Sequence, residues 1–200
     1  LNLVLGIVIM LLVGMVLLGG IKRIGSVSEK LVPFMALLYI VLAIGVVVLN
    51  FERVPAVFHD IVYGAFNPAA VTGGVIGSFF LSLKKGVSRG IFSNEAGLGS
   101  APIAAAAAVA DAPAQQGLIS MMGTFIDTIV ICTMTGLTIV ITGSWNIGLE
   151  GVSVTTRAFQ MGLPLPAQFS SFILMLCLVF FAFTTILGWN YYSERCLEYI

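Results

Sequence analysis

The chain has 200 residues, of which 59% are hydrophobic and 9% are charged. Ordinary soluble domains carry about 25% charged residues, so this composition indicates an all-α polytopic membrane protein and excludes an ordinary soluble domain. Nine basic and nine acidic side chains cancel, and we therefore expect no nucleic acid partner. The chain begins and ends inside apolar text, which we interpret as a piece of a longer protein.

The first two membrane spans are expected at about 1–20 and 29–50. The first is an uninterrupted apolar run about one bilayer long. Basic side chains follow in an expected short loop: Lys22, Arg23 and Lys30. Ser26 and Glu29 have the spacing of a capping box, which predicts that the second span begins there. The basic loop indicates that this side is cytoplasmic.

A helix on the outer membrane surface is expected over about 51–66, because its apolar residues recur at helical spacing. Polar side chains lie between them: Glu52, Arg53, His59 and Asp60. His59 is the one histidine of the sequence, and a single histidine cannot build a typical zinc site. Asn67-Pro68 is expected to end this helix.

The stretch from Gly86 to Ala108, GVSRGIFSNEAGLGSAPIAAAAA, predicts a helix that stops and restarts. Gly97 suits the left-handed residue that ends a helix. Ser100 suits an N-cap whose hydroxyl bonds a free N–H, and Pro102 suits the first turn that follows.

Backbone groups at such a break must find partners inside a membrane. A broken helix in a bundle is therefore a candidate site, whose carbonyls accept a cation and whose N–H groups accept a carboxylate. The alternative is a surface loop that leaves Asn94 and Glu95 in water.

Two topologies fit the residues before this break. In the first, 69–90 spans the membrane, and the basic cluster near its end is cytoplasmic together with SNEAG, as the positive-inside tendency favours; the cluster comprises Lys84, Lys85 and Arg89. In the second, 69–83 is peripheral or re-entrant and a spanning helix covers 84–112 with its break at about 93–99. The uncharged alanine run favours the second, because it is typical of a tightly packed, buried half-helix.

The next span is expected at about 115–142 and contains Asp127. A carboxylate at that depth is costly and usually faces a bundle interior or a cavity. A structural hydrogen bond to a neighbouring element is the alternative. A polar external connection is expected over 143–162.

The last span is expected at about 166–192 and carries Thr184 and Thr185. A threonine in a spanning helix most often bonds its own i−4 carbonyl, yet threonine oxygens are also ligands that alkali ions accept. Trp189 either limits the size of a substrate or forms part of an interfacial aromatic belt.

Three segments together resemble the alanine or glycine:cation symporters, the sodium:alanine symporter family. They are the stretch at 86–108, QQGLISMMGTFIDTIVICTMTGLTIVITG and FAFTTILGWNYYSERCLEY. The resemblance covers essentially the whole chain and corresponds to the middle of the family's length, about its fourth to eighth spans. Where the family often has a histidine in the alanine run, this chain has Ala104–Ala108.

The resemblance implies part of a leucine-transporter-type inverted-repeat fold, in which 84–112 is the broken sixth span. It also implies that Thr184 and Thr185 supply hydroxyl ligands to a sodium ion. Their remaining partners would be carbonyls of the family's first span, which this sequence does not include. Asp127 falls near a seventh-span position that binds a second sodium ion in some relatives.

We therefore expect a secondary active transporter rather than an enzyme. The expected reaction is sodium-coupled symport of alanine or glycine across the plasma membrane of a bacterial or archaeal cell, by a monomeric unit in the lipid bilayer. The expected substrate-binding residues are Phe92, Ser93, Asn94, Glu95, Gly97, Gly99, Ser100 and Trp189. Glu95 contacts substrate, braces the break or pairs with Arg89. Proton coupling or exchange on the same fold is the first alternative, and a membrane-embedded enzyme is a remote one, because it needs a nucleophile and a base within reach.

Overall fold

The computed structural model describes residues 2–66 and 75–200, and the regular elements in these ranges are all helical. In chain order they are α1 (Asn2–Leu17), α2 (Gly20–Leu49), the 3₁₀ turn η1 (Phe51–Arg53), α3 (Val54–Phe66), α4 (Val75–Ser93), α5 (Ala101–Ala106), α6 (Pro113–Phe125), the π-helical η3 (Ile126–Cys132), α7 (Thr133–Thr142), the 3₁₀ turn η4 (Ser144–Asn146), α8 (Val152–Gly162) and α9 (Ala167–Tyr199). The all-helical class is as predicted. The leucine-transporter-type arrangement stays a prediction.

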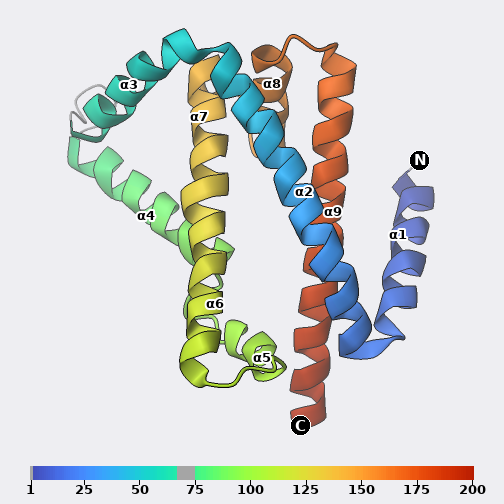
Figure 1. Cartoon of the computed structure of the whole chain (residues 1–200). Coiled ribbons are helices and arrows are strands. Elements are labelled where there is room, and N and C mark those ends of the chain that lie inside the picture. The colour runs from blue at the N-terminus through green and yellow to red at the C-terminus, as the bar shows by residue number, and fades with distance from the viewer. Residues whose placement is uncertain (1, 67–74) are drawn as a thin grey trace. The chain divides into compact units, whose positions relative to one another are not determined.

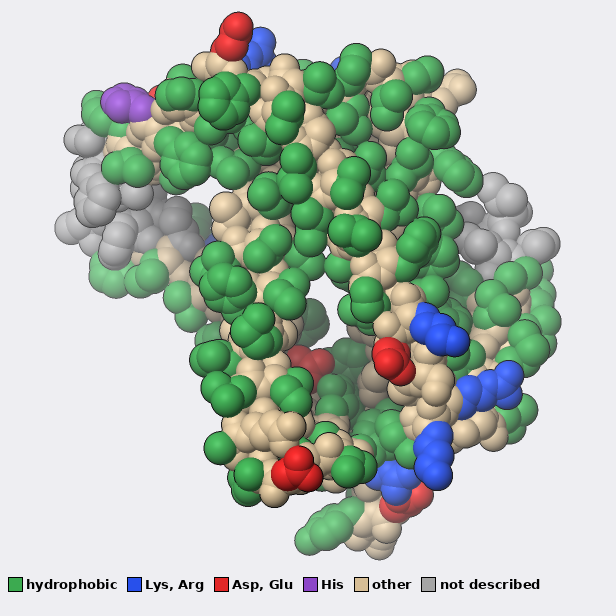
Figure 2. Space-filling model, in the orientation of Figure 1, with side chains coloured by type: hydrophobic (Ala, Val, Ile, Leu, Met, Phe, Trp, Pro, Cys, Tyr) green, Lys and Arg blue, Asp and Glu red, His purple; other side chains and the backbone are tan. Residues whose placement is uncertain are grey.

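Three helical stretches in the described residues are long and apolar enough to cross a membrane: α2, Pro113–Thr142 and α9. Pro113–Thr142 joins α6, η3 and α7 into one continuous column (Figure 1). Apolar side chains cover most of the face seen in Figure 2. Such a surface suits contact with lipid or with further apolar helices.

The chain divides into two compact units, and the first comprises Leu1–Leu42 and Leu165–Ile200. In this unit α1 packs against α9, which lies beside it in Figure 1. Two edge-to-face ring pairs join α2 to α9: Phe34 with Phe180 at 6.2 Å and Tyr39 with Phe181 at 6.4 Å between centroids. Aromatic packing between helices thus holds this unit together.

The second unit, Ala43–Pro164, is organised around α7, which contacts both α3 and α8. The end of α2 fits closely against the end of α8, because a Cβ on Gly162 would lie 2.4 Å from Val46 Cγ1. The side-chain amide of Asn50 donates to the carbonyls of Val46 at 2.8 Å and Gly162 at 3.1 Å. The Val46 carbonyl also accepts the backbone N–H of Asn50 at 3.1 Å, so the Asn50 amide adds a second bond there. Its bond to Gly162 pairs a carbonyl in the last turn of α8, where carbonyls have no partner within the helix.

The capping box predicted at Ser26 and Glu29 is wrong. Helix α2 begins at Gly20, so the basic residues expected in a loop lie in its first turns. The Ser26 hydroxyl donates to the carbonyl of Lys22 at 3.0 Å. A serine inside a helix can use this i−4 carbonyl instead of capping, and the lysine, arginine and glutamate around it are good helix formers.

Helix α8 lies within 143–162, which was expected to be only a polar connection. Helix α9 continues to Tyr199, beyond the predicted end near Tyr192. Residues 67–74, which include Asn67-Pro68 and the start of the 69–83 segment, lie outside the described residues. Helix α4 passes without interruption through residue 84, so where its spanning part begins stays a prediction.

Candidate functional site

The helical path is interrupted where the sequence predicted. Helix α4 ends at Ser93 and α5 begins at Ala101; we call the connecting residues 94–100 the hinge. The backbone takes positive φ at three hinge residues, with 51° at Glu95, 75° at Gly97 and 81° at Gly99. The left-handed conformation predicted for Gly97 is confirmed, and it prevents α4 from continuing directly into α5.

Ser100 does not cap α5 in the predicted way. It immediately precedes the helix, and Pro102 lies in the first turn, but the Ser100 side chain makes no capping bond. Its hydroxyl instead donates to Glu95 Oε2 at 2.6 Å. Donating this proton leaves the hydroxyl oxygen free to accept, so the bond to Glu95 does not itself prevent capping. The cap is absent because Ser100 has an α-helical backbone, with φ of −77° and ψ of −41°, whereas a capping residue usually has an extended one.

The alanine run does not form the buried half-helix that was predicted. Helix α5 has 6 residues, ends at Ala106 and contains no buried residue. Alanine side chains bury little apolar area, and a helix this short gains little from its own hydrogen bonds.

Two side-chain hydrogen bonds tie the end of α4 and the first hinge residue to the long helical column. The Ser93 hydroxyl donates to Asp127 Oδ2 at 2.6 Å, and the Asn94 amide donates to Thr128 Oγ1 at 2.9 Å. Asn94 also donates to the carbonyl of Gly90 at 3.1 Å. Asn94 and Glu95 therefore form hydrogen bonds with other residues of this chain. The alternative of a surface loop would have left both side chains in water.

The bonded residues of the column, Asp127 and Thr128, belong to the π-helical segment Ile126–Cys132. A π segment holds more residues per turn than an α-helix and occurs frequently at functional sites. No glycine or proline lies within IDTIVIC, so no sequence signal identified it. The sequence did identify Asp127, and the structure brings it to the hinge as a hydrogen-bond acceptor.

An open hollow of 700 Å³ lies along the hinge. It is lined by residues of α4, the hinge, α5 and α6: Gly90, Ile91, Asn94, Glu95, Ala96, Gly97, Gly99, Ala101, Pro102 and Thr124. Its side-chain polar groups come from Asn94, Glu95 and Thr124. Phe92 does not line it, and 66% of that side chain is exposed.

The threonine pair lies in α9, in the other unit. The Thr184 hydroxyl donates to the Phe180 and Phe181 carbonyls at 3.1 Å and 3.0 Å, and the Thr185 hydroxyl donates to the Phe181 carbonyl at 2.8 Å. Both hydroxyls thus donate the hydrogen bonds usual for threonine in a helix, while their oxygen lone pairs can still coordinate a cation. Trp189, one turn later, meets Tyr192 edge to face at 5.7 Å.

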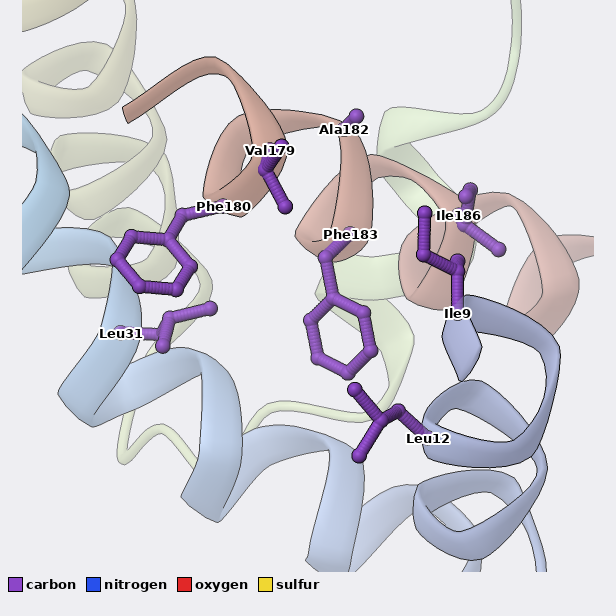
Figure 3. Close-up of a pocket in the computed structure, with 8 residues that line it drawn as sticks. All are labelled: Ile9, Leu12, Leu31, Val179, Phe180, Ala182, Phe183 and Ile186. Atoms are coloured by element: carbon purple, nitrogen blue, oxygen red, sulfur yellow. The ribbon is translucent and has the colours of Figure 1, made fainter. Parts of the chain in front are cut away.

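A second pocket, of 320 Å³, lies within the first unit between α1, α2 and α9 (Figure 3). It is lined by Ile9, Leu12, Leu31, Val179, Phe180, Ala182, Phe183 and Ile186. The rings of Phe180 and Phe183 face it, and neither Thr184 nor Thr185 lines it (Figure 3). This lining has no side-chain hydrogen-bonding group to orient a zwitterion, which distinguishes it from the hollow at the hinge.

The hinge brings groups that can bind a cation close to groups that can bind an anion. Glu95 lines the hollow with a carboxylate, and Asp127 places a second one beside Ser93 at the end of α4. The backbone of Gly97 and Gly99 is accessible at the hollow, because no atom beyond their immediate chain neighbours lies within 4 Å of where their Cβ atoms would be. Such an arrangement can hold a small molecule that carries both an ammonium and a carboxylate group, or a hard cation with oxygen ligands.

Comparison with known proteins identifies the family. The model of the sodium:alanine symporter family matches residues 1–200. The chain is 52% identical to an "uncharacterized transporter" of Haemophilus influenzae and 45% identical to the sodium/alanine symporter AgcS of Methanococcus maripaludis; each match covers 99% of this chain and 43% of the relative. It is 37% identical to a putative sodium/proton-dependent alanine carrier of Bacillus subtilis, over 96% of this chain and 41% of the relative. These names indicate transporters rather than enzymes. The chain thus spans less than half the length of these relatives, and it belongs to the sodium:alanine symporter family.

Proposed function

We propose that this chain forms the central part of a secondary active transporter that carries a small neutral amino acid, alanine or glycine, together with sodium across the plasma membrane. Family membership supports transport and an amino-acid substrate. The further supporting observation is the interrupted helix whose end and hinge are held by Ser93–Asp127 and Asn94–Thr128 hydrogen bonds. Irregular backbone at membrane depth is tolerated where it is buried in protein or lines a cavity, and this hinge lines one.

The substrate's carboxylate meets backbone N–H groups between Gly97 and Ser100 in this proposal. Positive φ at Gly97 and Gly99 turns the chain at these residues, and the missing side chains let a ligand approach the backbone closely. Phe92 does not line the hollow, so its proposed role as a wall that limits side-chain size needs a contact with substrate that this structure does not show. The same role for Trp189 rests on the family resemblance.

The coupling ion is proposed to bind at the hydroxyls of Thr184 and Thr185, with further ligands from parts of the transporter outside this sequence. Asp127 is proposed as a ligand of a second cation, since it places a carboxylate next to the hinge. Each ion drives transport only through its different affinity for the outward-open and inward-open states. Sodium at Thr184 and Thr185 is proposed to favour the outward-open state.

Proton coupling is the second candidate, because a relative is named as a sodium/proton-dependent carrier. Uptake of labelled alanine by the full-length parent in proteoliposomes distinguishes the two. Inward sodium and inward proton gradients are imposed separately, at matched membrane potential. Uptake driven by sodium alone supports the proposal. Equal uptake under a proton gradient would overturn the sodium sites and leave the substrate site standing, while no uptake of alanine or glycine would overturn the proposed substrate.

A further inference from the structure

Glu95 has a backbone conformation that glycine adopts more easily. Among the residues that the structure describes, it is the non-glycine residue with positive φ, at 51°. Side chains with a Cβ are disfavoured in the left-handed region, and such strain persists only where the surroundings hold it. The hinge uses glycine at its other two positive-φ positions, Gly97 and Gly99. A glutamate here therefore points to a task for its side chain.

The side chain of Glu95 reaches across the hinge. Its Oε2 accepts the hydroxyl proton of Ser100 at 2.6 Å, and Ser100 is buried, with 7% of its surface exposed. Glu95 is itself half-buried. A charge-assisted hydrogen bond with limited access to water is stronger and less readily exchanged than one on an open surface.

This bond closes a loop around Ala96, Gly97, Leu98 and Gly99. Within the loop the backbone is held by a longer bond, from Leu98 N to the Glu95 carbonyl at 3.3 Å. Ala96 N reaches back to the Ile91 carbonyl at 3.0 Å, which fixes where α4 ends. The Glu95–Ser100 bond thus fixes the far end of the loop, just before α5 begins.

The closed loop is also the wall of the hollow, which Glu95, Ala96, Gly97 and Gly99 all line. Without the Glu95–Ser100 bond, the glycine-containing loop has many more conformations available, and a ligand must restrict them when it binds. Glu95 does not pair with Arg89, since neither takes part in a salt bridge among the described residues.

We propose that Glu95 is a positioning residue. Its carboxylate braces the hinge through Ser100 and so preorganises the backbone from Ala96 to Gly99 for the substrate. This inference rests on the proposed function, because it takes the hollow at the hinge to be the substrate site. It separates bracing from the two other roles considered for Glu95, direct contact with substrate and pairing with Arg89.

Uptake kinetics of the full-length parent in proteoliposomes, with alanine as the probe, give the first test. We expect Glu95→Ala and Ser100→Ala each to raise KM about tenfold, because substrate must then pay for ordering the hinge. Vmax should stay within about twofold of the parent's, because the loop is already ordered once substrate is bound. The double variant should be no worse than either single variant, as expected when two residues act through one bond.

Conservative variants should keep the KM for alanine near that of the parent. Glu95→Gln keeps an acceptor and Ser100→Thr keeps the hydroxyl, so both should retain a KM close to that of the parent. Glu150→Ala, which removes an exposed glutamate of the same unit, is the matched control. If Glu95→Gln were as impaired as Glu95→Ala while Ser100→Ala were unaffected, the charge of Glu95 would act directly on substrate and the brace would be refuted. Additive effects of the two alanine variants would refute it as well.

Glu95→Gly separates the brace from a general structural role. Glycine relieves the unfavourable φ, so the melting temperature should stay unchanged or rise, while KM for alanine should rise as in Glu95→Ala. A parallel loss of melting temperature and uptake would mean that Glu95 serves folding rather than the site.

Hydrogen–deuterium exchange tests the brace whether or not the parent transports alanine. Peptides covering 94–100 should exchange faster in Glu95→Ala and Ser100→Ala than in the parent or in Glu150→Ala. Failure of alanine transport with this faster exchange would overturn the proposed function and retain the brace. Unchanged exchange in both variants would overturn the brace alone.

Discussion

The hydroxyl of Ser93 donates a hydrogen bond of 2.6 Å to the carboxylate of Asp127, which lies 34 positions later in the chain. The bond joins the last residue of α4 to the π-helical segment in the middle of the long column. The next residue along, Asn94, bonds to Thr128 in the same way at 2.9 Å. Two neighbouring ties fix both the position and the rotation of the chain where it enters the hinge.

Substitutions of Ser93 and Asp127 separate the structural hydrogen bond between them from the proposed binding of a cation by Asp127. Ser93→Ala should lower Vmax/KM for alanine about fivefold, because one charge-assisted hydrogen bond to a partly exposed group contributes about 1 kcal/mol. Asp127→Asn keeps an acceptor for Ser93, so KM for alanine should change little. The half-saturating sodium concentration should rise about tenfold if Asp127 is a cation ligand. An unchanged sodium dependence would leave Asp127 with the structural role alone.

The threonine pair gives the second prediction, measured as the sodium dependence of alanine uptake. Thr184→Ala and Thr185→Ala should each raise the half-saturating sodium concentration about tenfold, since each removes one oxygen ligand. Thr184→Ser and Thr185→Ser keep the oxygen and should resemble the parent. Thr156→Ala in α8, whose hydroxyl bonds the Val152 carbonyl in the same i−4 manner, is the control. The same sodium dependence in all these variants would refute the sodium site.

A matched pair of glycines tests the backbone of the hinge. Gly97→Ala forces a Cβ onto a residue with φ of 75° and should destabilise the hinge by about 1–2 kcal/mol. Gly86→Ala, within α4, meets open space and should instead stabilise the protein by about 0.5–1 kcal/mol. Alanine uptake should fall in the first variant and persist in the second, with melting temperatures measured in parallel. Normal uptake by Gly97→Ala would show that the left-handed turn is dispensable.

The close approach of α2 and α8 gives a prediction about stability. Gly162→Ala places a Cβ within 2.4 Å of Val46 and should cost about 1–3 kcal/mol, as overpacking does. The Asn50 bond to the Gly162 carbonyl should be lost with it. Gly136→Ala, which lies inside α7 and whose Cβ would meet no atom beyond the adjacent helix backbone within 4 Å, should raise the melting temperature slightly, as expected for Gly86→Ala. Equal melting temperatures for the two variants would contradict the packing described for this end of the unit.

Composition and local signals were enough to predict part of this structure. Long apolar runs indicated an all-helical membrane protein, and polar residues followed by glycines located the break after Ser93. These signals work because they depend on residues close together in the sequence. Asp127 was found for a similar reason, since a carboxylate inside an apolar run is conspicuous.

Contacts between distant segments could not be predicted in the same way. Nothing in the sequence paired Ser93 with Asp127, because that bond depends on how α4 lies against the column. The π segment is apolar and free of glycine and proline, so it resembles an ordinary helix. Helix α2 begins at Gly20, well before Ser26, and Ser100 has an α-helical backbone rather than the extended one of a capping residue. Local cap rules therefore assigned both wrongly.

The proposed site requires that the hinge bind the substrate and that sodium be present when it does. The most direct measurement is the labelling rate of Ala96→Cys, which lines the hollow, in the full-length parent with Cys132, Cys177 and Cys196 changed to serine. A water-soluble thiol reagent is applied with and without alanine, in sodium or in potassium. Val109→Cys, at a fully exposed position outside the hollow, is the control.

Alanine should slow labelling of Ala96→Cys in sodium but not in potassium, while Val109→Cys should be labelled at the same rate under every condition. Labelling of Ala96→Cys that does not change with alanine, in a protein that still transports alanine, would overturn the hinge as the substrate site.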